Sequence, residues 1–381
     1  MTLVRKLILS NYQAPGDILM LTAAVRDLHR SHPGGFVTDV RTSCAELWQN
    51  NPHLTPLCTD RPGVESVPCE YPLIHASNRS GQHFLHGFIE FLNDQLAVKI
   101  KPSRFSGDIH LSAEEKTAAS LVQELTGQEL PYWIIVAGGK FDFTLKWWHF
   151  RRWQAVVDHF RGRILFVQVG KADDYHPRLF NVLDLRNKTG LRDLVRLTYH
   201  AQGVLCPVTF HMHLAAAVEC RPDRARSRAC VVVAGGREPP HWEAYPAHQF
   251  IHTVGALPCC AEGACWRSRT VPLGDGDEKD SPQHLCLDVV DGLAHCMDLI
   301  TPEQVIDRIE YYFAGGQAAW LPAGAWKAIA PFLRPEERLT GVWSSLGAPR
   351  RRQPGTAFGR DPNQHNAKNK PQRRKQYANR A

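Results

Sequence analysis

The sequence predicts an α/β protein made of two Rossmann-like halves that face each other across a cleft. Three observations lead to this prediction. Apolar strand segments alternate with amphipathic helices, the alternation begins again after turn signals at residues 128–131, and each half contains a strand that leads through a short turn into a helix. Such alternation is typical of parallel sheets that are covered by helices on both faces.

In the first half, apolar runs mark the strands and a 3.6-residue periodicity marks the helices. The helix predicted from residue 18 places Ile18, Leu21 and Val25 on one face. The predicted strands are residues 7–10, 36–40, 73–75 and 108–111, and the predicted helices are residues 18–30, 45–50, 84–96 and 113–126. We assign this half, residues 1–129, to the acceptor side of the cleft.

The second half repeats the pattern. Its predicted strands are residues 133–137, 164–169, 203–206 and 229–234, and its predicted helices are residues 150–160, 191–200 and 211–219. Thr301 and Pro302 are typical of the cap and first position of a further helix that ends near residue 313. We therefore expect a second domain at residues 130–315, followed by an extension at 316–348.

The basic residues are concentrated at the C-terminus. Residues 350–380 hold ten Lys or Arg and one acidic residue, whereas the rest of the chain holds 35 basic and 37 acidic residues. Because residues 349–381 are also poor in apolar side chains, we expect them to be a disordered tail. The tail either improves solubility and contacts polyanions loosely, or serves a specific nucleic-acid function, for which no groove-reading motif is present.

The length and composition indicate a soluble chain that is long enough for two α/β domains and a tail. No apolar run reaches the roughly 18 residues that a membrane-spanning helix needs, and the N-terminus lacks a signal-peptide core. We expect a cytoplasmic protein, and its oligomeric state is left open.

Two turns after strands carry groups suited to a reaction with a phosphate-bearing ligand. Gly16 and Asp17 follow the first strand, where the carboxylate is either a general base or a cap of the following helix. Gly138, Gly139 and Lys146 follow the first strand of the second half, where they either hold phosphate or form a solvated loop.

A third turn resembles a phosphate-binding helix start, because a buried strand opens directly into a helix there. The candidate residues of this turn are Thr209, Phe210, His211, Met212 and His213. A lone histidine at such a position is more often a packing or capping residue than a ligand. Taken together, the three turns predict a ligand held between the two halves.

Five cysteines lie close together in the sequence. They are Cys259, Cys260, Cys265, Cys286 and Cys296, within a segment at residues 257–298. Four thiolates suit one tetrahedral zinc or iron ion, and a reducing cytosol disfavours disulfides. The alternative is a set of unrelated buried thiols. The polar turn at residues 273–280 lacks the ligand spacing of an EF-hand.

Three segments resemble glycosyltransferase family 9, the ADP-heptose heptosyltransferases. They are residues 16–28, 184–194 and 209–217, in the family's order, and the likeness covers roughly residues 5–220. The resemblance implies a GT-B fold, with ADP-heptose as donor and transfer to a hydroxyl with inversion. It implies Asp17 as the base, Lys146 and Thr209 at the diphosphate, and Asp173 or Asp174 at the donor ribose.

The chain departs from this family at one point. Where an Asp-Thr-Gly run is usual, it has Val208-Thr209-Phe210, which removes a carboxylate and narrows the space beside the diphosphate. The identity of the nucleotide sugar is less certain for this reason.

The cysteine segment resembles the insert of the bacterial autotransporter heptosyltransferase branch. That likeness implies a structural iron held by four cysteines and a protein serine or threonine as acceptor. Two alternatives stay open: transfer of a heptosyl or other sugar to a lipopolysaccharide core or small metabolite, and a catalytically inactive nucleotide-binding protein whose basic tail recruits nucleic acid.

Overall fold

The computed structural model describes residues 4–336. Its strands are β1 (Arg5–Asn11), β2 (Phe36–Thr42), β3 (Val64–Pro68), β4 (Tyr132–Ile135), β5 (Leu165–Gln168), β6 (Leu183–Asp184), β7 (Gly203–Pro207), β8 (Ala229–Gly235), β9 (His248–His252), β10 (Val289–Val290) and β11 (Leu293–Ala294). Its α-helices are α1 (Pro15–Ser31), α2 (His86–Leu96), α3 (Ala113–Thr117), α4 (Leu121–Thr126), α5 (Phe150–His159), α6 (Leu191–His200), α7 (Phe210–Ala217), α8 (Pro240–Glu243), α9 (His295–Asp298), α10 (Pro302–Ala314) and α11 (Ala325–Ile329). The predicted tail at residues 349–381 lies outside the described residues.

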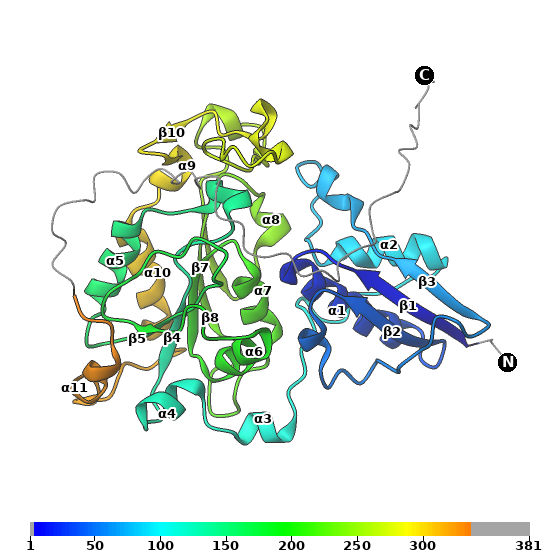
Figure 1. Ribbon diagram of the computed structural model, residues 1–381, viewed down its shortest axis with the longest axis horizontal. Coiled ribbons are helices and arrows are strands. Elements are labelled where there is room, and N and C mark those ends of the chain that lie inside the picture. The colour runs from blue at the N-terminus through cyan, green and yellow to red at the C-terminus, as the bar shows by residue number, and fades with distance from the viewer. Residues whose placement is uncertain (1–3, 337–381) are drawn as a thin grey trace, which may run out of the picture. The chain divides into compact units, whose positions relative to one another are not determined.

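Two parallel sheets organise the described chain (Figure 1). The N-terminal sheet has the order β2-β1-β3, and the C-terminal sheet has the order β6-β5-β4-β7-β8-β9. All neighbouring strands within these two sheets pair in parallel. The predicted α/β class with parallel sheets is therefore confirmed.

The C-terminal sheet is apolar on both faces. Along β4, Tyr132 and Ile134 belong to one hydrophobic cluster, and Trp133 and Ile135 belong to the other. Helices α6 and α7 lie on one side of this sheet and α5 and α10 on the other (Figure 1). The first cluster continues into the core of the N-terminal sheet, where α1 packs against α2 and α7.

Several predicted elements in the first half are wrong. Residues 73–75 form part of a 3₁₀ turn, Pro72–Ala76, because a proline at its first position sets the backbone for a helical turn. Residues 45–50 form only a short 3₁₀ helix, Ala45–Trp48. The helix predicted at 113–126 is broken between α3 and α4, where Ala118 is extended and Ser120 caps the second segment.

The strand predicted at residues 108–111 is also absent, although Asp108 and Ile109 are buried. The Asp108 amide donates to the side chain of Thr22 on α1, so its backbone partner is a side chain rather than another strand. The sheet instead gains β3, which the sequence did not reveal because its residues are mostly exposed and only Val64 and Val67 are apolar.

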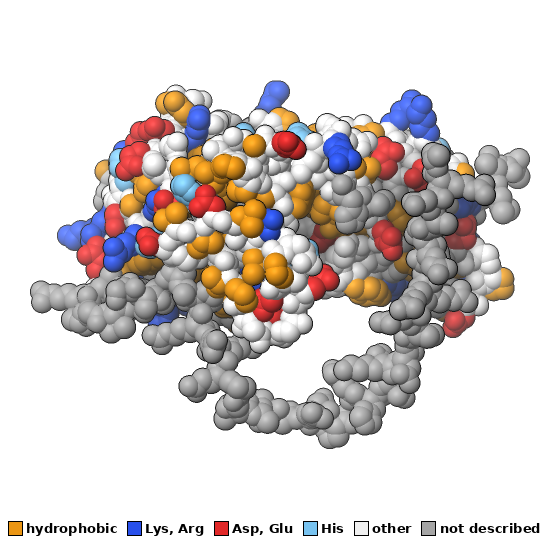
Figure 2. All heavy atoms as spheres, turned by 90° about the horizontal axis from the view of Figure 1, so that it is seen from above, with side chains coloured by type: hydrophobic (Ala, Val, Ile, Leu, Met, Phe, Trp, Pro, Cys, Tyr) orange, Lys and Arg blue, Asp and Glu red, His pale blue; other side chains and the backbone are white. Residues whose placement is uncertain are grey.

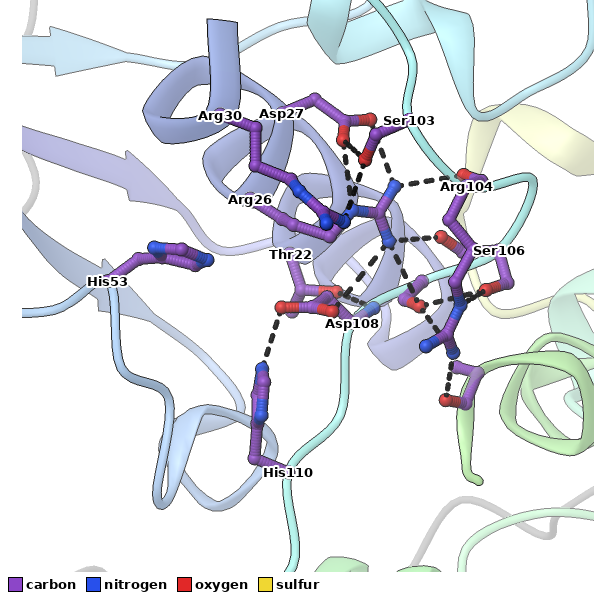
Figure 3. Close-up of polar contacts among 12 residues, drawn as sticks. Thr22, Arg26, Asp27, Arg30, His53, Ser103, Arg104, Ser106, Asp108 and His110 are labelled. Atoms are coloured by element: carbon purple, nitrogen blue, oxygen red, sulfur yellow. Dashed lines mark hydrogen bonds and ion pairs between the residues drawn. The ribbon is translucent and has the colours of Figure 1, made fainter. Parts of the chain in front are cut away.

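A buried ion network attaches residues 103–110 to α1 (Figure 3). Arg26 donates to both carboxylate oxygens of Asp27 at 2.9 Å and lies 3.7 Å from Asp108 Oδ1. Arg104 extends the network by donating to the Ala217 carbonyl at the end of α7, 2.8 Å away. The segment between the two sheets is thus fixed to one helix of each.

Charged side chains are mixed on the surface seen in Figure 2, where acidic and basic groups lie among apolar ones. This mixture agrees with the near balance of charge outside the tail. Among residues 4–336, no helix combines the length and the apolar character needed to cross a membrane.

Candidate active site

A cavity of about 600 Å³ lies where the loops after the parallel strands meet. Ligands of open α/β sheets bind at this edge, beyond the carboxyl ends of the strands. The lining comes from the turns after β1, β4, β5, β7 and β8 and from residues 189–194 at the start of α6. Of the residues predicted for the site, those lining the cavity are Gly16, Asp17, Gly138, Gly139, Lys146, Thr209, Phe210, His211 and His213.

Asp17 stands at the start of α1, caps that helix and lines the cavity. Its Oδ2 accepts the Ala14 amide at 2.9 Å, which caps the helix, and its Oδ1 accepts a short hydrogen bond from the Tyr71 hydroxyl. Burial raises the pKa of Asp17, and the Tyr71 hydrogen bond opposes that rise. The carboxylate is therefore held in place and faces the cavity as a candidate proton acceptor.

Gly16, at the start of α1, lies beside His213 of α7. A Cβ at this position would lie 3.4 Å from the His213 ring. His213 is buried, and its Nδ1 lies 2.8 Å from the Tyr245 hydroxyl. Burial keeps the pKa of His213 well below its usual range, so the ring is neutral.

Two cations in the cavity, Lys146 and Arg237, share the carboxylate of Glu238 and form a chain of three charges. Lys146 Nζ lies 2.5 Å from Glu238 Oε1, and Arg237 donates a short hydrogen bond to the same oxygen. Arg237 also stacks on Phe143 and Trp266, with its guanidinium carbon 4.7 and 5.3 Å from the ring centres. Two cations that converge on one oxygen are spaced to bind a ligand with two neighbouring negative charges.

The turn between β7 and α7 is the predicted helix start. Thr209 is the N-cap residue, and its hydroxyl accepts the His211 amide at 3.3 Å. His211 is half-buried, and desolvation lowers its pKa to about 3. Its Nε2 atom is buried and has no hydrogen-bond partner among the described residues. Met212 lies in the core, so its side chain does not line the cavity.

Two glycines and one aspartate complete the opposite wall. A Cβ on Gly138 would lie 1.9 Å from the Tyr175 carbonyl oxygen, while Gly139 exchanges two backbone hydrogen bonds with Tyr175. Asp174 lines the cavity, and burial raises its pKa. Asp173 does not line the cavity and pairs with Lys171 at the surface. Of the two aspartates, only Asp174 is placed to contact a ligand in this cavity.

The loop after β8 supplies site residues that sequence reasoning missed. Arg237, Glu238, Trp242 and Glu243 all line the cavity, as do Tyr71 and Phe84 from the first half. The signal available in the sequence was Gly235-Gly236 directly after a buried strand, because the end of a parallel strand lies at the binding edge.

The cysteine segment lies beside this loop. Burial, with a smaller contribution from three neighbouring thiols, raises the pKa of Cys296 to about 12. Those thiols belong to Cys265, Cys286 and Cys259. The Cys260 thiol lies 3.6 Å from the Thr253 carbonyl and also interacts with the Cys259 side chain. Within residues 4–336, no group of three or more His, Cys, Asp or Glu side chains is arranged to hold a metal ion.

Comparison with known proteins shows which solved structures share this fold. No protein-family model matches the sequence, and a search of curated proteins finds no match. Solved structures do match: the chain has the fold of family 9 glycosyltransferases, which confirms the predicted resemblance at the level of the fold.

Three of these structures illustrate the likeness. The glycosyl transferase family 9 protein of Veillonella parvula DSM 2008 is 14% identical with a TM-score of 0.54, and the match covers 83% of this chain and 99% of that one. Escherichia coli ADP-heptose lipopolysaccharide heptosyltransferase II is 14% identical with a TM-score of 0.51, covering 83% and 100%. The iron-containing dodecameric glycosyltransferase TibC of enterotoxigenic E. coli H10407 is 16% identical with a TM-score of 0.55, covering 83% and 78%.

Proposed function

We propose that this chain is an inverting glycosyltransferase of the GT-B type that moves a heptosyl group from ADP-heptose to a hydroxyl group. One observation carries the proposal: Asp17 and the Lys146–Glu238–Arg237 chain of charges share one cavity at the carboxyl ends of two parallel sheets. The fold of family 9 glycosyltransferases supports the same conclusion.

In the proposed reaction, Asp17 takes the proton of the acceptor hydroxyl while that oxygen attacks the anomeric carbon from the face opposite ADP. The new carbon–oxygen bond forms as the bond from the anomeric carbon to the diphosphate breaks, and its electron pair leaves with ADP. Lys146 and Arg237 stabilise the charge that develops on the leaving diphosphate.

The remaining predicted residues surround the nucleotide in this proposal. Gly138 and Gly139 let the backbone approach the diphosphate, and Thr209, Phe210 and the neutral His211 form the helix-start wall. Asp174 is the proposed contact to the ribose. Met212 contributes only through its backbone.

A donor screen tests the proposal. Purified protein is incubated with ADP-heptose and other nucleotide sugars in the presence of hydroxyl acceptors, and release of nucleoside diphosphate is measured. We expect ADP-heptose to be used and Asp17→Asn to reduce turnover by about 100-fold or more, the usual contribution of a general base. Full activity of Asp17→Asn removes the assigned base.

For the cysteine segment, we propose that Cys259, Cys265, Cys286 and Cys296 hold one structural iron or zinc ion. Cys260 is the fifth cysteine, and the proposal leaves it out because its thiol donates to the Thr253 carbonyl and is not among the thiols that act on Cys296. The neighbouring thiols that raise the pKa of Cys296 support this choice. With four sulfur ligands an ion would have no open position, so these cysteines would fasten the segment and the ion would supply no reaction chemistry. The described side chains are not arranged around an ion, so binding would require them to move closer together. Elemental analysis of the purified protein distinguishes iron, zinc and no metal.

For the acceptor, we propose a serine or threonine of a protein substrate in the cytoplasm. Mass spectrometry of candidate acceptor proteins tests this assignment, because one heptosyl transfer adds a fixed mass to the polypeptide. A mass gain on a lipopolysaccharide core or a small metabolite, with none on any protein, favours the alternative acceptors.

A non-catalytic nucleotide-binding role is the second candidate, and Val208-Thr209-Phe210 is the observation that favours it. In that case ADP binds without turnover of any nucleotide sugar, and salt-sensitive RNA binding is lost when residues 349–381 are deleted.

A further inference from the structure

Two buried carboxyl groups in the cavity each have one oxygen without a hydrogen-bond partner among the described residues. Glu238 and Glu243 are 2% and 5% exposed, and both line the cavity. Lys146 and Arg237 are both directed at a single oxygen, Glu238 Oε1. The other oxygen, Glu238 Oε2, is buried and has no hydrogen-bond partner among the described residues.

Glu243 also has one carboxyl oxygen without a hydrogen-bond partner in the described chain. Its Oε2 is buried without a hydrogen-bond partner in the described chain, and the nearest ring nitrogen, His213 Nε2, is 3.4 Å away. Because His213 is neutral, this contact provides no compensating charge. Burial, with Glu238 as the next cause, raises the pKa of Glu243 to about 8, so near neutral pH its carboxyl group can both donate and accept hydrogen bonds.

A buried polar atom left without a hydrogen-bond partner destabilises the folded protein. Folded proteins keep few such atoms, and a group of them in a cavity indicates a ligand that completes their hydrogen bonds. Here two unpaired carboxyl oxygens come from one short loop, the segment that joins β8 to the end of α8.

The position of Glu243 indicates which part of a ligand these oxygens meet. The charged groups that act on it come from both ends of the proposed reaction centre: Glu238, Lys146, Arg237 and Asp17. Glu243 also raises the pKa of Tyr71, the hydrogen-bond partner of Asp17. Glu243 Oε2 also lies 3.4 Å from the His213 ring, which borders Gly16 beside Asp17, while Glu238 in the same loop pairs with both cations. The two glutamates therefore connect the Asp17 side of the cavity to the cations proposed to hold the diphosphate.

In a nucleotide sugar, the group between the attacking hydroxyl and the diphosphate is the sugar ring. Its hydroxyl groups are hydrogen-bond donors that match carboxyl oxygens. We infer that Glu238 and Glu243 form the subsite that recognises the hydroxyl groups of the transferred sugar. This inference rests on the proposed function and adds to it the residues that select the sugar.

The same arrangement explains why Glu238 has two roles. Without ligand, its Oε1 neutralises Lys146 and Arg237. A bound diphosphate offers these cations other oxygens, which frees the Glu238 carboxylate to turn toward a sugar hydroxyl. Arg237 can stay in place while its partner changes from Glu238 to the diphosphate. Its Nε donates to the Arg267 carbonyl at 2.6 Å, and its guanidinium group stacks on the rings of Phe143 and Trp266.

The test separates binding of the nucleotide from binding of the sugar. Affinities for ADP and for ADP-heptose are measured by calorimetry for the wild type, Glu243→Met, Glu243→Gln and the control Glu262→Met, whose side chain is exposed outside the cavity. We expect Glu243→Met to bind ADP within about twofold of the wild type and ADP-heptose at least about tenfold more weakly.

The conservative variant sharpens the result. Glu243→Gln keeps a donor and an acceptor at the same place, so it should retain most of the affinity for ADP-heptose. Equal loss of ADP and ADP-heptose in Glu243→Met, or no loss of either, overturns the inference while the proposed function stands. A wild-type chain that binds neither compound overturns the proposed function as well.

Discussion

Replacing Tyr71 by phenylalanine tests how the cavity tunes Asp17. The Tyr71 hydroxyl donates to Asp17 Oδ1, and burial together with the charge of Asp17 raises the pKa of the phenol, so the hydroxyl remains a donor throughout the working pH range. The ring packs against Phe84 and Phe88 with centroids 5.1 and 5.0 Å away, contacts that phenylalanine preserves. The substitution therefore removes the hydrogen bond to Asp17 and the one that the hydroxyl shares with the Gln13 side chain, and it keeps the packing of the ring.

The size of the effect follows from that bond. A hydrogen bond to a charged group contributes about 1.5–3 kcal/mol, and about 1.4 kcal/mol corresponds to one pKa unit. Because this bond stabilises the charged form, its loss raises the pKa of Asp17 by about one to two units above its already raised value. A general base works only when deprotonated, so activity is lost as the pH falls through this pKa.

The assay is the pH dependence of kcat/KM with ADP-heptose, which reports the free enzyme. We expect the acidic limb of the profile to move to higher pH by about one to two units in Tyr71→Phe, with a smaller change at alkaline pH. Tyr12→Phe serves as control, because Tyr12 is 71% exposed and lies outside the cavity. A profile of Tyr71→Phe that superposes on the wild type refutes the reasoning.

Two further substitutions address stability and the diphosphate wall. Arg26→Met leaves the carboxylate of Asp27 buried without its cationic partner, so it should lower the free energy of unfolding by about 3–5 kcal/mol. Arg30 is exposed, so Arg30→Met should change the free energy of unfolding little. Urea denaturation measures both variants, and equal effects contradict the role of the network. Gly138→Ala places a Cβ 1.9 Å from a backbone oxygen, so it should weaken ADP binding. Gly139→Ala is the control, because its Cβ meets only one side-chain atom, at 4.0 Å. Calorimetry compares the ADP affinities of the two variants, and an unchanged affinity of Gly138→Ala argues against close packing at this position.

The second sheet could be predicted well because each of its main strands is buried on both faces. An uninterrupted apolar run such as residues 133–137 or 229–234 is a local signal that needs no knowledge of partners. The weaker strands β6 and β9 were missed, since β6 has two residues and the residues of β9 are only partly buried or exposed.

The first half was predicted less well because its backbone groups form hydrogen bonds with residues that are distant in the sequence. Residues 108–111 read as a strand by composition, but the hydrogen bond to Thr22 replaces a neighbouring strand. The edge strand β3 carries few apolar residues, and only its register beside β1 makes it a strand. Neither outcome can be found from a local pattern.

The amino-acid sequence alone determined the α/β class and the turns that carry Asp17, Lys146 and Thr209, because helix periodicity, strand runs and turn residues act over a few neighbours. Only the tertiary structure decided that Tyr71 bonds to Asp17 and that Glu238 and Glu243 lie beside the same cavity. Parallel strands bring the ends of distant segments to one edge, and the strand order that does so depends on the packing of the whole sheet.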